Sequence, residues 1–162
     1  MNIVLVQPEI PQNTGNVART CAALGATLHL VHPLGFRVDD RSLRRAGLDY
    51  WHLLTVRHHA SYADFLLGRD PRETVLFTSR GRVAYSQVAY SSDVCLVFGN
   101  ESHGLPEEIL STHTGPIVRI PTVSEARCLN LSNAVAVAAY EAARQAGFVG
   151  LQMSREVGPC LD

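Results

Sequence analysis

Lysine is absent from this chain of 162 residues, and neither acidic nor basic side chains predominate. The formal net charge is −1, so charge alone does not predict binding to nucleic acid. All fourteen basic residues are arginines, several of them clustered, and a planar guanidinium can donate two parallel hydrogen bonds to a phosphate. On charge alone, a solvated surface is still the better interpretation of these clusters.

Closely spaced cysteines and long apolar runs are also absent. No two of the four cysteines have the C-x-x-C spacing of a metal or redox site, which favours reduced thiols in a cytoplasmic protein. The longest apolar stretches have the length of strands and are too short to cross a bilayer, so no membrane partner is expected. Residues 1–6 contain neither a basic region nor a cleavage site, and we therefore expect no signal peptide.

Strand-like and helix-like segments alternate along residues 1–150, which predicts a single α/β domain followed by a tail at 151–162. The expected strands are apolar on both faces, as in a mostly parallel sheet with helices on both faces. We expect strands at residues 3–7, 27–31, 53–56, 74–78, 94–98 and 117–120. We expect helices within residues 11–24 and at 41–46, 62–67, 106–110 and 131–145.

Three polar segments follow expected strands, where ligands bind in open α/β sheets. In the first segment, residues 8–19, Asn13 and Thr14 can cap a helix, so the helix should begin beside them. Arg19 would then lie one turn into this helix and could point into a crevice at its start. The alternative is a capped helix with an exposed arginine.

The second segment, residues 97–106, places Glu101 between two glycines directly after a buried strand. Gly99 and Gly104 allow the backbone to approach a ligand or to adopt positive φ. The Glu101 carboxylate can accept hydrogen bonds from backbone amides or an arginine. A simple tight turn would also favour glycine and asparagine, but it does not explain a Glu-Ser-His sequence between the glycines.

The third segment, residues 120–137, is a polar loop that enters the longest expected helix. Asn130, Ser132 and Asn133 place capping side chains at the helix start, where free amides favour polar or anionic ligand atoms. The many alanines of this helix permit close packing. Packing inside the same domain and packing across a dimer interface both remain open.

In this order and spacing, the three segments resemble the three motifs of the SPOUT superfamily, in its 2′-O-ribose methyltransferase branch. The first motif is matched by Asn13, Gly15, Asn16 and Arg19, and the second by residues 98–105. The third is matched by Ile120-Pro121 with residues 129–134. The resemblance covers almost the whole chain, and the minimal size together with residues 44–50 is similar to the tRNA methyltransferases that act on the wobble nucleotide.

This resemblance implies a five- or six-stranded α/β sheet whose C-terminal part forms a trefoil knot. It implies that S-adenosylmethionine, held in the knot, methylates the ribose 2′-hydroxyl of nucleotide 34 of tRNA, a cytidine or a modified uridine. A homodimer through the C-terminal helix would share the RNA site between its protomers. No metal is implied, and His58-His59 lacks carboxylate or cysteine ligands at suitable spacing.

The resemblance also implies roles for individual residues. The catalytic group would comprise Arg19, Asn13 and Glu101. The methyl donor would contact Phe77, Thr78, Gly99, Glu101, Ile120, Cys128 and Leu129. The RNA would contact Arg127, Tyr140 and Arg44. The sequence departs from the usual pattern at Asn100 and His103, where Pro and Arg are often found, and at Cys128, where Ser is common.

The expected reaction is an in-line attack of the ribose oxygen on the sulfonium methyl group. A guanidinium with a pKa above about 12 is a poor general base, so we assign Arg19 to stabilising the developing oxyanion. Two other functions are compatible with the sequence. One is a non-catalytic RNA-binding module of the same fold, and the other is a serine hydrolase with Ser102 as the nucleophile of an imperfect nucleophile elbow.

Overall fold

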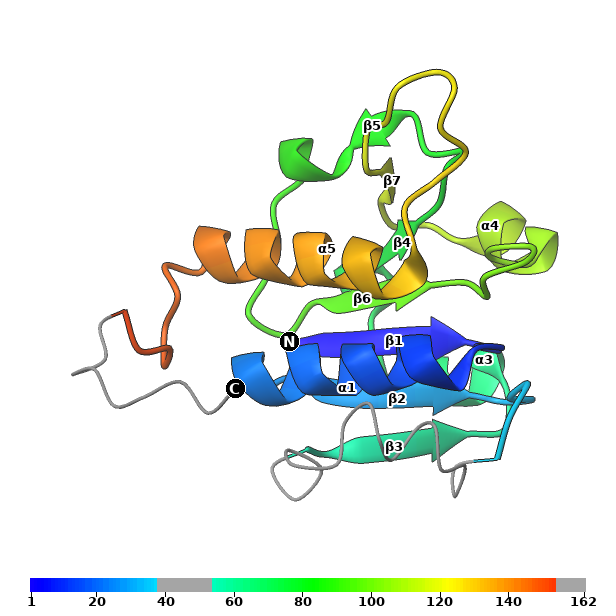
Figure 1. Ribbon diagram of the computed structural model, residues 1–162, viewed down its shortest axis with the longest axis horizontal. Helices are drawn as coiled ribbons and strands as arrows, with labels where there is room; N and C mark the ends of the chain where they lie inside the picture. The colour runs from blue at the N-terminus through cyan, green and yellow to red at the C-terminus, as the bar shows by residue number, and fades with distance from the viewer. Residues whose placement is uncertain (38–53, 154–162) are drawn as a thin grey trace.

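The computed structural model describes residues 1–37 and 54–153 and shows an open sheet of seven strands with helices on both faces (Figure 1). The strand order is β3-β2-β1-β6-β4-β7-β5, and every pairing is parallel. The expected α/β class and parallel sheet are therefore confirmed, whereas the expected five or six strands are too few. The strands are β1 (Asn2–Val6), β2 (Thr27–Val31), β3 (Val56–His59), β4 (Thr74–Phe77), β5 (Val83–Ala84), β6 (Cys95–Phe98) and β7 (Ile117–Arg119).

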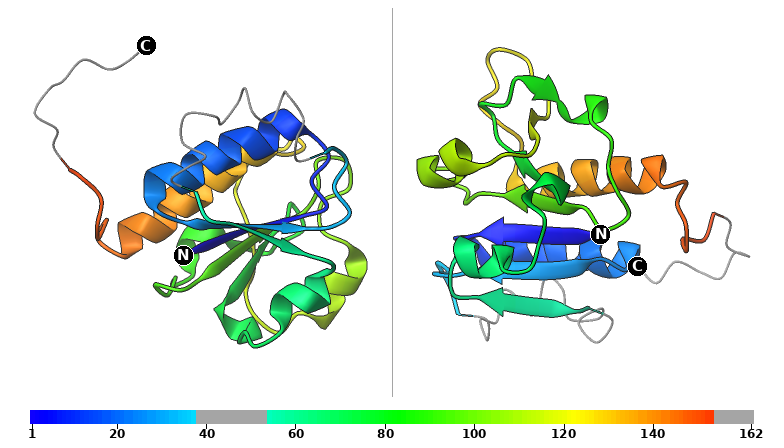
Figure 2. Two further views of the ribbon diagram at one scale, coloured as in Figure 1. Left: turned by 90° about the horizontal axis from the view of Figure 1, so that it is seen from below. Right: turned by 180° about the vertical axis from the view of Figure 1, so that it is seen from behind.

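Among the described residues, α-helices lie on both faces of the sheet (Figure 2). The long helices α1 (Pro11–Leu24) and α5 (Leu131–Gln145) lie side by side on one face, and the short helices α3 (Tyr62–Leu66) and α4 (Glu107–Thr112) lie on the other. Each face has its own apolar cluster. No helix in the described ranges is long and apolar enough to cross a membrane.

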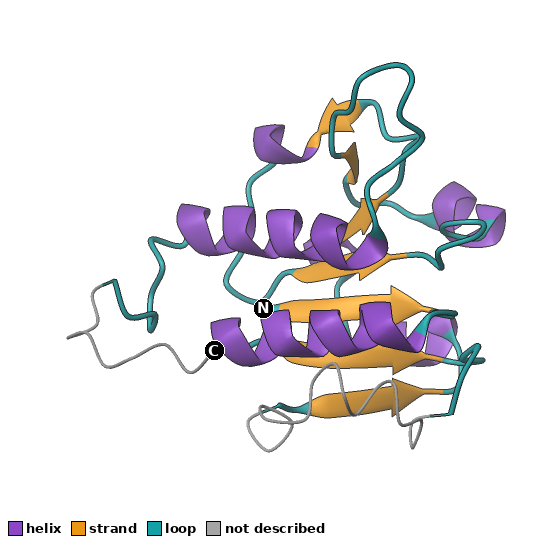
Figure 3. Cartoon of the chain, viewed as in Figure 1, coloured by secondary structure: helices purple, strands orange, loops and turns teal. Residues whose placement is uncertain are grey.

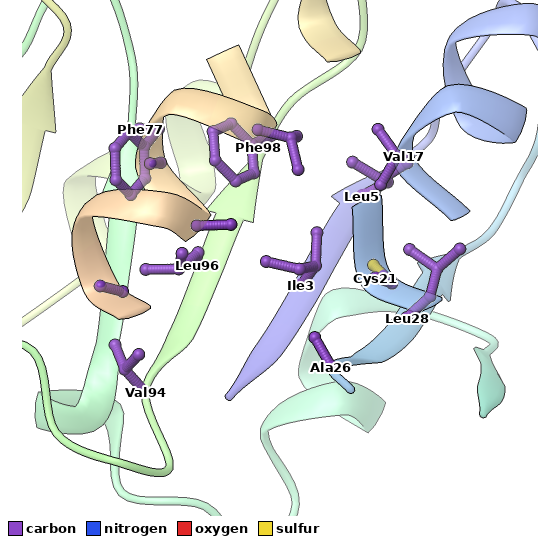
Figure 4. Close-up of a cluster of buried hydrophobic side chains, with 14 of the residues drawn as sticks. Ile3, Leu5, Val17, Cys21, Ala26, Leu28, Phe77, Val94, Leu96 and Phe98 are labelled. Atoms are coloured by element: carbon purple, nitrogen blue, oxygen red, sulfur yellow. The ribbon is translucent and has the colours of Figure 1, made fainter. Parts of the chain in front are cut away.

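The central strand β1 contributes to both clusters because successive side chains of a strand point to opposite faces. Ile3 and Leu5 point into the larger cluster, under α1 and α5, while Val4 and Val6 point into the smaller one. Figure 4 shows the larger cluster, in which Ile3 lies between the β6 side chains and those of α1. The two-sided apolar pattern of the sequence thus has the physical origin that was expected.

Helix α5 uses its alanines to pack against its own domain. Ala138, Ala139, Ala142 and Ala143 are all buried, and α1 is the helix that contacts α5 most extensively. Small side chains let two helices and the sheet approach closely, so the alanine face gives no evidence of a subunit interface. Of the two interpretations left open by the sequence, internal packing accounts for these residues.

Helix α1 begins at Pro11, earlier than the sequence suggested. Ile10 is the N-cap and no side chain caps the helix, so the expected capping role of Asn13 and Thr14 is wrong. The physical reason is Pro11, whose fixed φ and missing N–H suit the first helical position. At the other end, Gly25 adopts φ 63° and ends the helix as expected.

The remaining boundaries differ mostly by one or two residues, but β3 is displaced. The strand expected at residues 53–56 is observed at Val56–His59, a polar sequence that lies at the edge of the described sheet and pairs there with β2. The two-residue strand β5 was not expected, because it has too few residues to show a period. Three predicted features lie outside the described residues: the helix at residues 41–46, Arg44 and the tail from residue 154.

Candidate active site

The polar segments meet at one edge of the sheet, beyond the carboxyl ends of the strands. Figure 3 shows the arrowheads of the central strands pointing the same way, with loops following them at that end. Residues 7–10 follow β1, residues 99–104 follow β6, and residues 120–130 lead from β7 to α5. Because β1 and β6 are neighbours, the first and second segments come into direct contact.

Glu101 is the centre of this contact. Its carboxylate accepts hydrogen bonds from the backbone N–H of Glu9 at 2.8 Å and of Ile10 at 3.3 Å, and from Asn13 Nδ2 at 2.9 Å. An ionised carboxylate can only accept hydrogen bonds, and these three donors occupy most of its acceptor positions. The negative charge also lies at the N-terminus of α1, where the helix dipole favours an anion.

Asn13 extends the network to the third segment. This side chain is 6% exposed, and its Oδ1 accepts a hydrogen bond from Asn130 Nδ2 at 3.0 Å. Asn130 in turn caps α5, because its Oδ1 accepts from the backbone N–H of Ser132 at 2.9 Å. A single side chain therefore joins all three segments, and the expected cap at Asn130 is confirmed.

The turn at residues 99–104 is closed by its own backbone. Asn100 and Gly104 exchange two hydrogen bonds, at 3.2 and 3.0 Å, and Gly104 adopts φ 71°. A Cβ added at Gly99 would lie 1.9 Å from the carbonyl carbon of Gly104. Gly104 thus has the positive φ that was expected, and the close approach of Gly104 to Gly99 requires a glycine at position 99.

Ser102 is bonded to a carboxylate rather than to a histidine. Its backbone N–H, at 3.3 Å, and its Oγ, at 2.5 Å, both donate to Glu9 Oε2. Across the described ranges we find no histidine hydrogen-bonded to the Ser102 hydroxyl. A hydrolytic nucleophile needs an adjacent general base, so the geometry argues against the hydrolase interpretation. Nothing in the sequence singled out Glu9 beyond its place in the polar segment that follows β1.

Four of the residues assigned to the methyl donor lie at adjacent strand ends. Phe77 ends β4 and stacks on Phe98 of β6, with 4.7 Å between ring centroids. Thr78 follows Phe77, and its backbone N–H already donates to Val118 O of β7 at 3.0 Å. Gly99 and Ile120 follow β6 and β7. Cys128 and Leu129 lie on the exposed loop before α5, together with Arg127.

Arg19 is exposed and lies farther along α1 than expected. Because the helix begins at Pro11, Arg19 is in its third turn, about 9 Å along the helix axis from Asn13. The structure joins Asn13 to Glu101 by a hydrogen bond. Tyr140 is 49% exposed on the face of α5 that points away from the sheet.

A histidine chain on the α3 face was missed by the sequence analysis. The ring of His29 is buried between Asn2 Oδ1, at 3.1 Å, and His59 Nε2, at 2.9 Å, and His59 Nδ1 lies 3.8 Å from the Asp64 carboxylate. Burial, reinforced by the nearby charge of Arg69, lowers the pKa of His29 to about 3. Within the described residues, no group of three or more His, Cys, Asp or Glu side chains could hold a metal ion.

The protein is therefore of the parallel α/β class, with polar segments that meet beyond the carboxyl ends of its strands. Comparison of its sequence with known families then identifies the family. The model of the SpoU rRNA methylase family matches residues 1–140, and the chain belongs to that family. This result confirms the family that the three segments indicated.

Relatives of similar length carry a more specific name. A protein of Escherichia coli K12 named tRNA (cytidine(34)-2′-O)-methyltransferase is 47% identical over 151 residues, which cover 93% of this chain and 96% of the relative. A protein of the same name from Burkholderia cenocepacia is 49% identical over 152 residues, covering 92% and 97% of the two chains.

Solved structures agree with the family. One, described as giving structural insights into the 2-OH methylation of C/U34 on tRNA, has a TM-score of 0.84 and 50% identity, covering 91% of this chain and 96% of the other. An AdoMet-bound rRNA methyltransferase from Sinorhizobium meliloti has a TM-score of 0.79 and 28% identity. That alignment covers 88% of this chain and 55% of the larger protein.

Proposed function

We propose that this protein transfers a methyl group from S-adenosylmethionine to the ribose 2′-hydroxyl of nucleotide 34 in tRNA. The observation that carries the proposal is similarity over nearly the full length of proteins with this named activity, at 47% identity in the case of the E. coli protein. A non-catalytic RNA-binding module would not need the joined arrangement of Asn13, Glu101 and Asn130. A tRNA substrate also favours a cytoplasmic location.

The methyl donor would bind at the ends of β4, β6 and β7 and against the loop before α5. Phe77, Thr78, Gly99 and Ile120 lie at these strand ends, and Cys128 and Leu129 are on the exposed loop. The backbone N–H of Thr78 is already bonded to Val118 O, so it is not available to donate a hydrogen bond to the methyl donor. Cys128 is compatible with a backbone contact, in which the usual serine hydroxyl is not required.

Glu101 and Asn13 would act by holding the turn at residues 99–104, here called the donor turn because it would contact the methyl donor, against α1. The ribose oxygen attacks the methyl carbon, the carbon–sulfur bond breaks, and sulfur keeps the electron pair as a neutral thioether. The proton of the 2′-hydroxyl leaves to a substrate phosphate or to water. Arg19 would stabilise the charge that develops on the oxygen, and desolvation and orientation would supply the rest of the acceleration.

The active site would be completed by a second copy of the chain. Arg19 lies on the exposed side of α1, about 9 Å along the helix axis from Asn13. Two exposed apolar side chains, Val137 and Tyr140, lie on the face of α5 opposite its alanines, and Leu129 is exposed nearby in the chain. A two-fold contact through this face would bury them and would bring RNA-binding residues such as Arg127 from two protomers together.

We also place residues 1–150 in one domain whose C-terminal part forms a trefoil knot. Strand β7 inserts between β4 and β5, which are consecutive strands in the sequence, and the chain then returns to α5 over the central strands. Such an insertion is the arrangement that a threaded C-terminal segment would produce. Pulling on the two chain ends tests this, because a tightened knot leaves the extended chain shorter than an unknotted chain of the same length.

The proposed activity is tested by nucleoside mass spectrometry of tRNA from cells with and without the gene. The expected result is loss of one 2′-O-methylated nucleotide, mapped to position 34, and its return when purified protein and S-adenosylmethionine are added. Unchanged tRNA together with binding of the donor and of tRNA would favour the non-catalytic module.

A further inference from the structure

We infer that Glu9 is a positioning residue of the methyltransferase site, which holds the donor turn at residues 99–104 in register with helix α1. The inference rests on the proposed function for its readout. It is carried by a second set of hydrogen bonds between the first and second segments, separate from those of Glu101 and Asn13.

Glu9 and Glu101 bridge the same two loops in opposite directions. The backbone N–H of Glu9 donates to Glu101, whereas the Glu9 carboxylate accepts from the backbone N–H and the hydroxyl of Ser102, the residue after Glu101. Each carboxylate is thus fixed by donors on the opposite loop. Two such bonds in opposite directions resist both sliding and separation of the loops, which a single bridge at Glu101 would not do.

The backbone of Glu9 is held in place from its other side. Gly35 donates its N–H to Pro8 O at 2.9 Å, and a Cβ added at Gly35 would lie 2.8 Å from Glu9 Cα. Gln7, two residues earlier, adopts φ 52°, a left-handed conformation that non-glycine residues rarely take. This redirection of the chain after β1, with the loop packed against Gly35, aims Glu9 at the turn. Backbone strain of this kind is concentrated at functional sites.

Glu9 is only partly buried, so its carboxylate is not needed to fill the core. Its bonds act on residues 99–104, which carry Gly99 and Glu101. A small misplacement of a reacting group can lower a rate by about a hundredfold. Loss of the Glu9 side chain should therefore lower the rate of methyl transfer by a larger factor than it lowers the fraction of folded protein.

The test compares Glu9→Ala with Glu9→Gln and with the control Glu108→Ala, an exposed glutamate in the first turn of α4. The measurements are single-turnover methyl transfer to tRNA, the Kd of S-adenosylmethionine by calorimetry, and thermal unfolding. We expect Glu9→Ala to lose about tenfold or more in rate, since misplacement is costly. Glu9→Gln keeps an acceptor for Ser102 and should recover most of that loss, and Glu108→Ala should match the unmodified protein.

The double variant Glu9→Ala/Ser102→Ala should be no slower than Glu9→Ala alone, because the two residues form one interaction. A rate for Glu9→Ala equal to that of Glu108→Ala would overturn the inference. The inference would also be overturned if the rate of Glu9→Ala fell only in proportion to its folded fraction, because the folded molecules would then be fully active. Failure of the unmodified protein to methylate any tRNA would instead contradict the proposed function. In that case the inference is tested by the Kd of S-adenosylmethionine, and a Kd that is the same for Glu9→Ala as for the unmodified protein overturns it.

Discussion

Single side chains decide how the site is held together. Asn13 is nearly buried and uses both ends of its amide, the Nδ2 toward Glu101 and the Oδ1 toward Asn130. An aspartate of the same shape could not donate to Glu101, and a leucine could do neither. The chemistry of the amide is therefore required at this position, which explains why it is part of a recognisable motif.

At the same scale, Arg19→Ala is expected to lower single-turnover methylation by about a hundredfold or more, as is usual when one oxyanion donor is lost. The Kd of S-adenosylmethionine should hardly change, because the interaction forms mainly in the transition state. Arg19→Lys should restore the rate only partly, since an ammonium lacks the two-pronged geometry. Near-normal rates for Arg19→Ala at saturating tRNA would exclude the catalytic role.

His29 should make the folded protein sensitive to acid. Its pKa is lowered to about 3 in the folded state by burial, so below about pH 6.5 the unfolded chain binds a proton that the folded chain does not. Stability is therefore present above the ordinary histidine pKa and is lost as the pH falls, by at most about 1.4 kcal/mol per pH unit from this one group.

Urea unfolding at about pH 7 and about pH 5 measures this effect, because the pH dependence reports the difference in bound protons. The variant His29→Gln should be less stable at both pH values, but its side chain does not titrate in this range. The difference between the two pH values should be smaller for the variant than for the unmodified protein. An identical difference in the two proteins would show that other groups cause the acid sensitivity.

At the scale of elements, the start of α5 serves both as a helix terminus and as part of the site. Asn130 Oδ1 caps the helix, while Asn130 Nδ2 holds Asn13. These two roles can be separated, since serine is as good a capping residue as asparagine but has no amide to donate.

We expect Asn130→Ala to lower the free energy of unfolding by about 1 kcal/mol, the usual effect of losing an N-cap. Asn130→Ser should keep most of that stability. Both variants should be slower in methyl transfer because the link to Asn13 is lost. If Asn130→Ser is as active as the unmodified protein, the cap alone explains the residue.

At the scale of the whole molecule, the two faces of α5 have different roles. The alanine face is internal, and Ala139 is fully buried. The opposite face exposes Val137, at 37%, and Tyr140, at 49%, which are large apolar side chains for an external helix surface. The proposed dimer therefore uses the outer face, and the alanine-rich sequence alone would have directed a test to the wrong side of the helix.

Val137→Glu should give folded monomers with little methyltransferase activity, because a charge would be introduced into the proposed interface. Val149→Glu is the matched control, since Val149 is 85% exposed beyond the end of α5. Ala139→Glu should instead cost several kcal/mol of stability, as an unpaired charge would be buried in the core. Light scattering and thermal unfolding distinguish the cases, and a monomeric unmodified protein would rule out the proposed interface.

Much of this architecture follows from local sequence patterns. The two-sided apolar strands are dictated by the burial of both faces of a parallel sheet, and residues 131–145 were expected as the helix that is observed. Gly25, Gly104 and the Asn130 cap have the expected conformation or contact, because positive φ and capping depend on nearby residues. The family could likewise be identified from short motifs in a fixed order.

The tertiary structure alone decided how distant residues are paired. Glu101 lies 88 residues from Asn13 in the sequence and Asn130 lies 117 residues from it, and only the neighbouring positions of β1, β6 and α5 bring them together. The same is true of Glu9 with Ser102 and of His29 with His59. Periodicity reports which side of an element is buried, but it does not report which element covers it. The sequence by itself therefore determined the class of fold and the segments of the site, while the packing of the sheet determined which of their side chains act together.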